Sequence, residues 1–183
     1  MIPQQAEVSV DATGLESHHI SPYFLRRAGR TKRTTPFARL AVLCEHSTHM
    51  FAAALARAGP ANESPLLRPL VHDAAGRLAI HTLHADAAYD SEAHHRLCRE
   101  QFGIARTIIP INHRGRPHVT PTTPYRLEMK RAFPEQQAGQ RWHVESAISQ
   151  HKRRLGDSLT ARKRPWRDAE CYLRVLTHNL MIL

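Results

Sequence analysis

Hydrophobic and polar residues alternate at several places in the first half of the chain. A strand is predicted over residues 6–14 (AEVSVDATG), because its valines alternate with polar residues before a group of turn formers. Two strands around a His-Ser-Thr turn are predicted over residues 36–60, although the alanines of the second half would also suit a helix. Residues 78–86 and 105–111 predict two more strands, and the second of these is short and β-branched.

Helical patterns lie between and after these strands. A serine followed by a proline predicts a short helix over residues 64–70, which ends at a turn around Asp73 and Gly76. Asp90 is expected to cap a second helix, SEAHHRLCREQF, which would end at Gly103. Strands interspersed with helices are typical of a mixed sheet covered by helices.

The second half of the chain begins with a segment rich in turn-forming residues, which two helices follow. Proline, glycine and basic residues predict a loop and linker over residues 112–140. Helices are predicted around residues 141–155 and 167–182. The expected architecture is therefore α/β, with residues 1–183 forming a single domain.

Composition supports one folded unit. The 183 residues are 42% hydrophobic and include only 8 glycines, which is enough apolar material for one core. Cys44, Cys98 and Cys171 are far apart in the sequence, so neither a disulfide framework nor a cysteine-based zinc site is indicated. A reducing compartment fits this pattern.

Membrane insertion is not expected. The longest apolar runs, such as residues 51–58, are far shorter than the roughly 20 residues that a membrane span requires. The N-terminus has no charged-then-apolar signal architecture. We expect a cytoplasmic, nucleoid-associated protein without a membrane partner.

Positive charge is concentrated in one part of the chain. Residues 96–167 contain sixteen of the 26 lysines and arginines but only five of the 16 acidic residues, which accounts for the net charge of +10. A basic surface of this kind suits a polyphosphate partner, because each neutralised phosphate releases counterions. A solvated basic face that only maintains solubility is the simpler interpretation.

One acidic residue within this basic region points to a site. On a helix, Arg141, Glu145 and Lys152 lie within about 60° of one another. An Arg–Glu pair at this spacing stabilises a helix by only about 0.2–0.5 kcal/mol. Two other carboxylates, Asp11 and Asp86, lie where strands end, and three carboxylates brought together repel one another unless a cation such as Mg²⁺ lies between them.

These acidic segments resemble known motifs. The sequences VDATG at residues 10–14, ADAAYDS at residues 85–91, and R-x-x-x-E-x-x-x-x-x-x-K at residues 141–152 resemble the three motifs of DDE transposases of bacterial insertion sequences, in the four-like and five-like groups. The motifs occur in the family's order, with 75 and 59 residues between the acids. The terminal helix, with its His178-Asn179 pair, is also similar, so the resemblance covers nearly the whole chain.

The resemblance implies a fold, an activity and a set of roles. The family has a ribonuclease H-like fold, here expected as a mixed five-stranded sheet flanked by helices. Its members are DNA endonucleases that cut transposon ends and join them to target DNA in recombination. The three acids would bind two Mg²⁺ or Mn²⁺ ions, and the partners would be transposon-end and target DNA, with a homodimer also considered. The residues expected to contact DNA are basic: Arg141, Lys152, Arg153, Arg114 and Arg116.

The sequence departs from the family pattern in three places. Ala138 stands where the family has a tyrosine, and Ala88 stands where it has a glycine. Asp11 lies only ten residues after Met1, whereas full-length relatives carry an N-terminal region that recognises the element's ends. The chain is therefore expected to be a catalytic domain that lacks this region, and a truncated, inactive remnant that only binds DNA is the alternative.

Other site chemistries have weaker support. Zinc could be held by histidines such as His18, His19, His94, His95 or those of Cys44-x-His46-x-x-His49, but the strand-turn spacing places these last side chains on different faces. No serine or cysteine nucleophile has a local signature. Trp142 and Trp166 suit either base stacking or packing. A ribonuclease of the same fold is a third hypothesis, which an RNA:DNA hybrid substrate would test.

Overall fold

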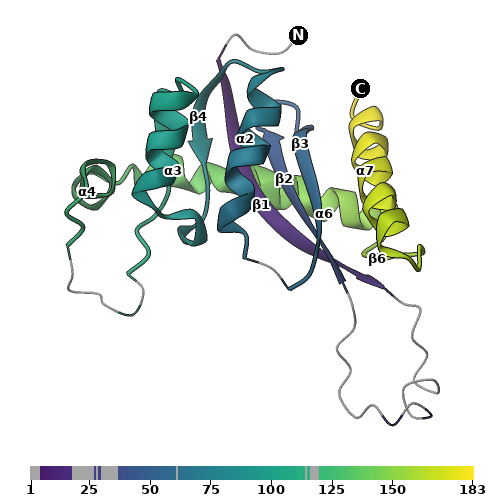
Figure 1. The fold of residues 1–183 in the computed structure, drawn as a ribbon. Helices are drawn as coiled ribbons and strands as arrows, with labels where there is room; N and C mark the ends of the chain where they lie inside the picture. The colour runs from purple at the N-terminus through teal and green to yellow at the C-terminus, as the bar shows by residue number, and fades with distance from the viewer. Residues whose placement is uncertain are drawn as a thin grey trace.

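A mixed β-sheet forms the centre of the protein (Figure 1). The computed structural model describes residues 5–17, 27, 29, 37–60, 62–113, 115 and 120–183. In this part of the chain the sheet has the order β3-β2-β1-β4-β5, and a short β6 pairs with β1. The strands are β1 Ala6–Ser17, β2 Phe37–Glu45, β3 Phe51–Ala58, β4 Ile80–His84, β5 Arg106–Ile108 and β6 Ser158–Leu159.

Strand directions follow from the connections. β1, β2 and β3 are antiparallel neighbours, whereas β4 is parallel to both β1 and β5. The connection from β3 to β4 contains η1 (Ser64–Leu66) and the helix α2 (Leu67–Ala75). β3 and β4 run in the same direction, and strands that run in the same direction need such a crossover connection. This strand order, with helices on both faces, confirms the ribonuclease H-like α/β class.

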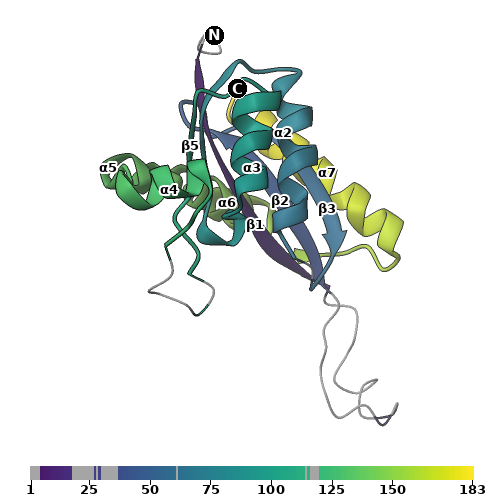
Figure 2. The same ribbon diagram turned by 60° about the vertical axis from the view of Figure 1, so that its left-hand side comes forward.

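Helices cover both faces of the sheet, as Figures 1 and 2 show. α2 and α3 lie over one face, α6 crosses the other face beneath β1 and β2, and α7 packs along β3 and β2. The other helical segments are η2 Ala87–Tyr89, α3 Glu92–Arg96, η3 Leu97–Gln101, α4 Pro124–Arg131, α5 Glu135–Ala138, η4 Gly139–Arg141, α6 Trp142–Leu155 and α7 Arg164–Leu180. Among the described helices, none has the length and apolar character needed to cross a bilayer.

Each face of the sheet has its own hydrophobic core. Alternation along β1 directs Ala6, Val8 and Val10 toward α2 and α3, where they join one core. Leu15 has the opposite orientation and packs with residues of α6 and α7, including Val144. Odd-numbered residues of β1 therefore face α6, and Asp11 is one of them.

The predicted strands were located correctly, but several boundaries differ. β5 covers only Arg106–Ile108, and the helix predicted over residues 64–70 continues to Ala75. Gly103 ends the helical segment η3 as expected, with a φ of 66° that favours glycine. The predicted loop and linker at residues 112–140 contains α4 and α5.

The predicted cap of α3 was wrong by one residue. Ser91 is the N-cap, and its side chain accepts a hydrogen bond from the backbone N–H of His94 at 3.1 Å. Asp90 instead pairs with Arg126 of α4 and accepts a hydrogen bond from the backbone N–H of Asn112. The side chain of Asp90 is fully buried, so it anchors the following segment instead of capping the helix.

Candidate active site

Asp11 and Asp86 lie on neighbouring parallel strands. Ser9 of β1 is paired with His84 of β4, and each aspartate follows its strand's paired residue by two positions. Because side chains of a strand alternate between faces, this register brings Asp11 and Asp86 to the same face of the sheet. Asp86 follows the end of β4 as predicted, but the prediction was wrong for Asp11, because β1 continues past it to Ser17. η2 begins directly after Asp86, whose Oδ1 accepts a hydrogen bond from the Ala88 N–H at 2.7 Å.

Ala88 is compatible with this turn although the family has glycine there. Among the described non-glycine residues, only His49 has a positive φ, so the backbone at Ala88 does not require glycine. Its N–H is directed to the Asp86 carboxylate. The substitution therefore leaves the second motif with a regular local geometry.

Glu145 lies in the first turn of α6, the helix that covers this face of the sheet. Val144 and Ala147 of α6 are fully buried against the sheet, which fixes the rotation of the helix and leaves Glu145 at the edge of the buried stripe. Arg141, the residue before α6, contacts both Glu145 and Asp11, with 3.5 Å between its Nη1 and Asp11 Oδ2. Its guanidinium thus lies between two of the three predicted acids.

The electrostatics connect all three acids. Burial raises the pKa of Asp11 above its ordinary value, and the charges of Asp86 and Glu145 raise it further. The Ala12 N–H, which donates to Asp11 Oδ1 at 2.8 Å, and the positive charge of Arg141 lower it. A partly buried group of acids with one nearby guanidinium is the environment that a hard divalent cation would stabilise.

The donor set suits Mg²⁺ or Mn²⁺, since all three side chains offer carboxylate oxygens. The side chains do not form a closed cage here: within the described chain, Asp11, Asp86 and Glu145 are not among the groups whose ligand atoms all lie within 4.8 Å of one another. Two ions about 3.5–4 Å apart can share carboxylates that do not touch each other. Residues Asp11, Asp86 and Glu145 could therefore hold such a pair of ions.

The predicted DNA-contacting residues are placed only in part. Lys152 and Arg153 lie in the last turn of α6, about 10 Å along the helix from Glu145. Arg153 is exposed and Lys152 is half-buried. Arg114 and Arg116 lie outside the described residues, so their predicted role stays a prediction.

Three further residues belong to the surroundings of the acids, although the sequence did not indicate them. The pKa of Glu63 is raised by burial and by the charges of Asp86 and Asp11, while its ion pair with Arg39 lowers it. Tyr89 is fully buried nearby, and burial together with the same acids raises the pKa of its hydroxyl. No local motif marks Glu63 or Arg39, since Arg39 is brought close by the pairing of β2 with β1 and Glu63, between β3 and α2, is joined to it by an ion pair.

Comparisons with known proteins identify a family for this chain. A family profile described as "Transposase DDE domain" matches residues 3–180. A solved structure described as the catalytic core domain of BIV integrase is similar at 17% sequence identity and a TM-score of 0.47, with 93% of this chain and 81% of that chain covered. No curated protein matches the chain. Since the family profile spans nearly all of its residues, the chain belongs to the transposase DDE domain family.

Proposed function

We propose that this chain is the catalytic domain of an insertion-sequence transposase of the four-like or five-like groups, which cuts DNA at the element's ends and transfers the cut strands to target DNA. The observation that carries the proposal is the convergence of three acids from β1, the end of β4 and the start of α6. The charges of Asp86 and Glu145 both raise the pKa of Asp11, and Arg141 contacts Asp11 and Glu145. The family match supports a nuclease-type enzyme.

The proposed roles follow from the position of each side chain. Asp11, Asp86 and Glu145 would hold two divalent ions, which when bound supply activation of the attacking oxygen and stabilisation of the leaving oxygen of a phosphodiester. Asp11 lies on β1, where it is paired with Val42 of β2, Asp86 lies two residues after the end of β4, and Glu145 lies on α6, which packs against β1 and β2. Such rigid supports suit a site whose ligands must keep their relative positions.

Basic residues of α6 would hold the substrate. Arg141 pairs with Asp11 and Glu145 in the free protein, and its guanidinium is also suited to a scissile-strand phosphate. Lys152 and Arg153 lie further along the same helix, where they would bind backbone phosphates. DNA would then lie along α6, with the cleaved bond next to Glu145.

The test is nicking of supercoiled plasmid DNA with Mg²⁺ or Mn²⁺. We expect Asp86→Asn and Glu145→Gln each to reduce nicking by at least about 10²-fold, because each removes a charged ligand needed in the transition state. Glu135→Gln changes an exposed acid of α5 and serves as the matched control, which should keep full activity. Filter binding at increasing salt should show that all three variants still bind DNA.

Three outcomes would contradict the proposal. Nicking that survives both active-site substitutions would exclude this site. Salt-sensitive DNA binding by a wild-type chain that never nicks would support the inactive DNA-binding protein instead. Preferential cleavage of an RNA:DNA hybrid would indicate a ribonuclease.

A further inference from the structure

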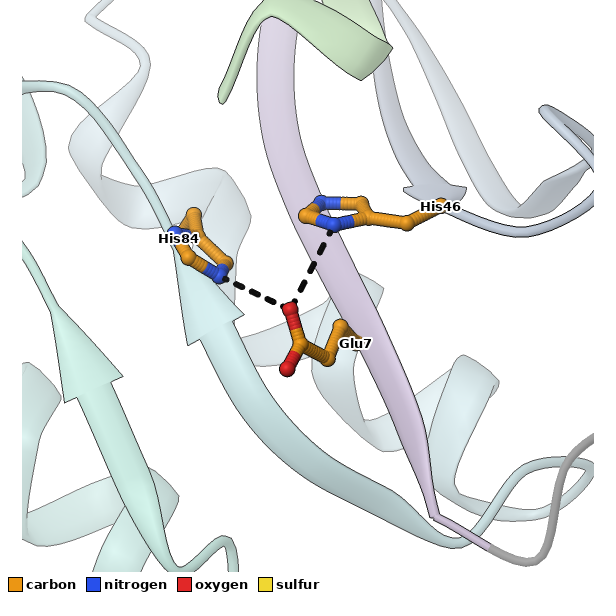
Figure 3. A group of neighbouring side chains, drawn as sticks. All are labelled: Glu7, His46 and His84. Atoms are coloured by element: carbon orange, nitrogen blue, oxygen red, sulfur yellow. Dashed lines mark ion pairs between the residues drawn. The ribbon is translucent and has the colours of Figure 1, made fainter. Parts of the chain in front are cut away.

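A second cluster of side chains lies on the same face of the sheet, separate from the predicted active-site acids. Glu7 is on β1, His46 directly follows β2, and His84 is the last residue of β4. Figure 3 shows both imidazole rings turned toward the Glu7 carboxylate. Glu7 Oε2 lies 3.7 Å from His46 Nδ1 and 3.7 Å from His84 Nε2, and one ligand atom from each residue lies within 4.8 Å of the others. We call these three residues the histidine site.

The backbone holds the histidine site in place. β1 lies between β2 and β4, so the three residues come from adjacent strands. The N–H of His46 donates to the carbonyl of Glu7 at 3.0 Å, and His84 is paired with Ser9 in the parallel ladder. Glu7 and His84 therefore lie on paired strands, and His46, the first residue of the turn after β2, is held to β1 by its backbone hydrogen bond.

His84 lacks a hydrogen-bonding partner in its buried position. Its side chain is only 2% exposed, and neither of its ring nitrogens makes a hydrogen bond. The 3.7 Å separation from Glu7 is too long for a hydrogen bond. A buried imidazole whose ring nitrogens make no hydrogen bond is destabilising, and a cation between Nε2 and the Glu7 carboxylate would give one of these nitrogens a close partner.

His46 is oriented in the manner of a metal ligand. Its Nε2 is joined to the Ser9 hydroxyl by a hydrogen bond of 2.7 Å, which fixes the ring and leaves Nδ1 facing Glu7. A metal-binding histidine commonly has its second nitrogen held by such an outer partner. Metal ions bind imidazole in its neutral form.

His143 connects the histidine site to α6 without being a ligand. Its ring stacks on that of His46 with centroids 4.5 Å apart. Both of its nitrogens are already engaged, Nδ1 with His49 at 2.7 Å and Nε2 with Gln140 at 3.0 Å. Because His143 lies two residues before Glu145, an ordered His46 ring would also support the start of α6.

The ligand atoms of the histidine site indicate which metal ion it would bind. Two imidazole nitrogens and one carboxylate oxygen suit zinc and other borderline divalent ions, whereas Mg²⁺ prefers oxygen ligands alone. Donors around a tetrahedral zinc ion lie about 3.3 Å apart, so the 3.7 Å separations need to shrink by only a few tenths of an ångström. The Glu7 side chain is 51% exposed, which gives an ion access from solvent.

We propose that Glu7, His46 and His84 bind one Zn²⁺ ion, with a water molecule in the fourth position. The ion would join β1, β2 and β4 at their ends and so fix the strands that carry Asp11 and Asp86. This inference does not depend on the proposed function, because a zinc ion can stabilise the sheet whether or not the chain cuts DNA.

The test is a zinc titration of the untagged full chain in competition with a chromophoric chelator. Excess Mg²⁺ is present so that sites made only of carboxylates are already occupied. We expect one zinc ion per wild-type chain. Glu7→Gln and His84→Gln should each weaken binding by at least about tenfold. Zinc should also raise the Tm of the wild type and leave that of Glu7→Gln unchanged, since binding to the folded state alone stabilises it.

Two controls separate the histidine site from other sites. His72→Gln removes an exposed histidine of α2, and Asp86→Asn removes a predicted catalytic acid; both should bind zinc as the wild type does. Glu7 is half exposed, so Glu7→Gln should remain folded, which circular dichroism would check, even if His84→Gln does not. The proposal is overturned if the wild type takes up no zinc, if Glu7→Gln binds it equally well, or if Asp86→Asn alone loses it.

Discussion

Arg141 links two of the acids that are predicted to bind metal ions. Its guanidinium contacts both Asp11 and Glu145, so in the free protein it partly balances their charges. A divalent ion between these carboxylates would compete with the arginine for the same oxygens. Arg141 could then turn toward a DNA phosphate, which would couple metal binding to substrate binding.

Asp11 is expected to lower the stability of the metal-free protein. Burial raises the pKa of its carboxyl group, so ionisation is harder in the folded than in the unfolded state, and stability falls as the pH rises through the carboxyl range. We predict that Asp11→Asn raises the Tm by about 1–4 °C near neutral pH in chelator-treated buffer. Thermal unfolding followed by circular dichroism would measure this.

The control for this prediction is an exposed acid. Asp157→Asn removes the same charge at an exposed position and should leave the Tm within about 1 °C of the wild type. A Tm for Asp11→Asn at or below that of the wild type would contradict the argument from burial.

The sequence could single out Asp11, Asp86 and Glu145 because each acid lies within a short local pattern, and their catalytic role stays a prediction. Arg141 was predicted in the same way, four residues before Glu145. His46 was considered as a zinc ligand from the sequence, but its neighbours Glu7 and His84 could not be predicted, since the pairing of β1 with β2 and β4 brings the three together, and Glu63 reaches the acids from the segment between β3 and α2. A sequence alone does not state which residues of different strands become neighbours.

At the scale of elements, α4 is attached to the start of α3 by buried charges. Arg126 donates two hydrogen bonds to Asp90, from Nε to Oδ1 at 2.9 Å and from Nη2 to Oδ2 at 2.7 Å. Glu92 accepts from the backbone N–H of Arg126 at 3.1 Å, at the positive end of α4. These contacts fold the segment predicted as a linker back against the body of the domain.

Breaking this ion pair should therefore be strongly destabilising. Arg126→Ala leaves the fully buried Asp90 carboxylate without its guanidinium, which costs about 3–5 kcal/mol and should lower the Tm by roughly 6–20 °C. Urea unfolding would give the free energy directly. Glu128→Gln breaks the Arg99–Glu128 pair, whose glutamate is 47% exposed, and should cost less than about 1 kcal/mol. Equal costs for the two variants would contradict this prediction.

Strong periodicity explains which elements could be predicted. β1 alternates in its first half, β2 is a nearly continuous buried apolar run, and α6 and α7 are long. α4 and α5 were missed because prolines and charged residues obscure their pattern, and β6 has only two residues. Asp90 was a reasonable cap by residue type, but Ser91 offers the same chemistry one position later, and the ion pair with Arg126 decides between them.

At the scale of the whole molecule, buried histidines should make the fold sensitive to acid. Burial lowers the pKa of His95 to about 4 and that of His151 to about 4. Unfolding restores an ordinary value of about 6.5, so stability is complete above this value and is lost as the pH falls toward 4. The two groups together can contribute up to about 2.7 kcal/mol per pH unit in this window.

We predict that the free energy of unfolding falls by about 3–4 kcal/mol between pH 6.5 and about pH 5. Urea unfolding at several pH values would measure it. His151→Leu removes one titrating ring, whose Nε2 has no hydrogen bond, and should reduce this fall by about 1.6 kcal/mol. A stability that does not change across this range would contradict the prediction.

The uneven charge distribution should appear as a salt dependence of DNA binding. If Lys152 and Arg153 each neutralise one phosphate, replacing either with alanine should reduce the slope of log affinity against log salt by about 1. Arg68→Ala changes an exposed arginine on α2, which covers the other face of the sheet, and should leave the slope unchanged. Equal slopes for all three variants would place the DNA elsewhere.

Each of the two hydrophobic cores contains at least one of the three free cysteines, whose reaction with an alkylating reagent can be followed. Cys98 lies in the core beneath α2, whereas Cys44 and Cys171 lie in the core beneath α6. Burial raises the thiol pKa to about 12 for Cys98 and Cys44 and to about 11 for Cys171, so none is nucleophilic while its core is closed. Alkylation at a given cysteine therefore records the opening of the layer that surrounds it, and comparing the cysteines reveals whether the two layers separate from the sheet together or one at a time.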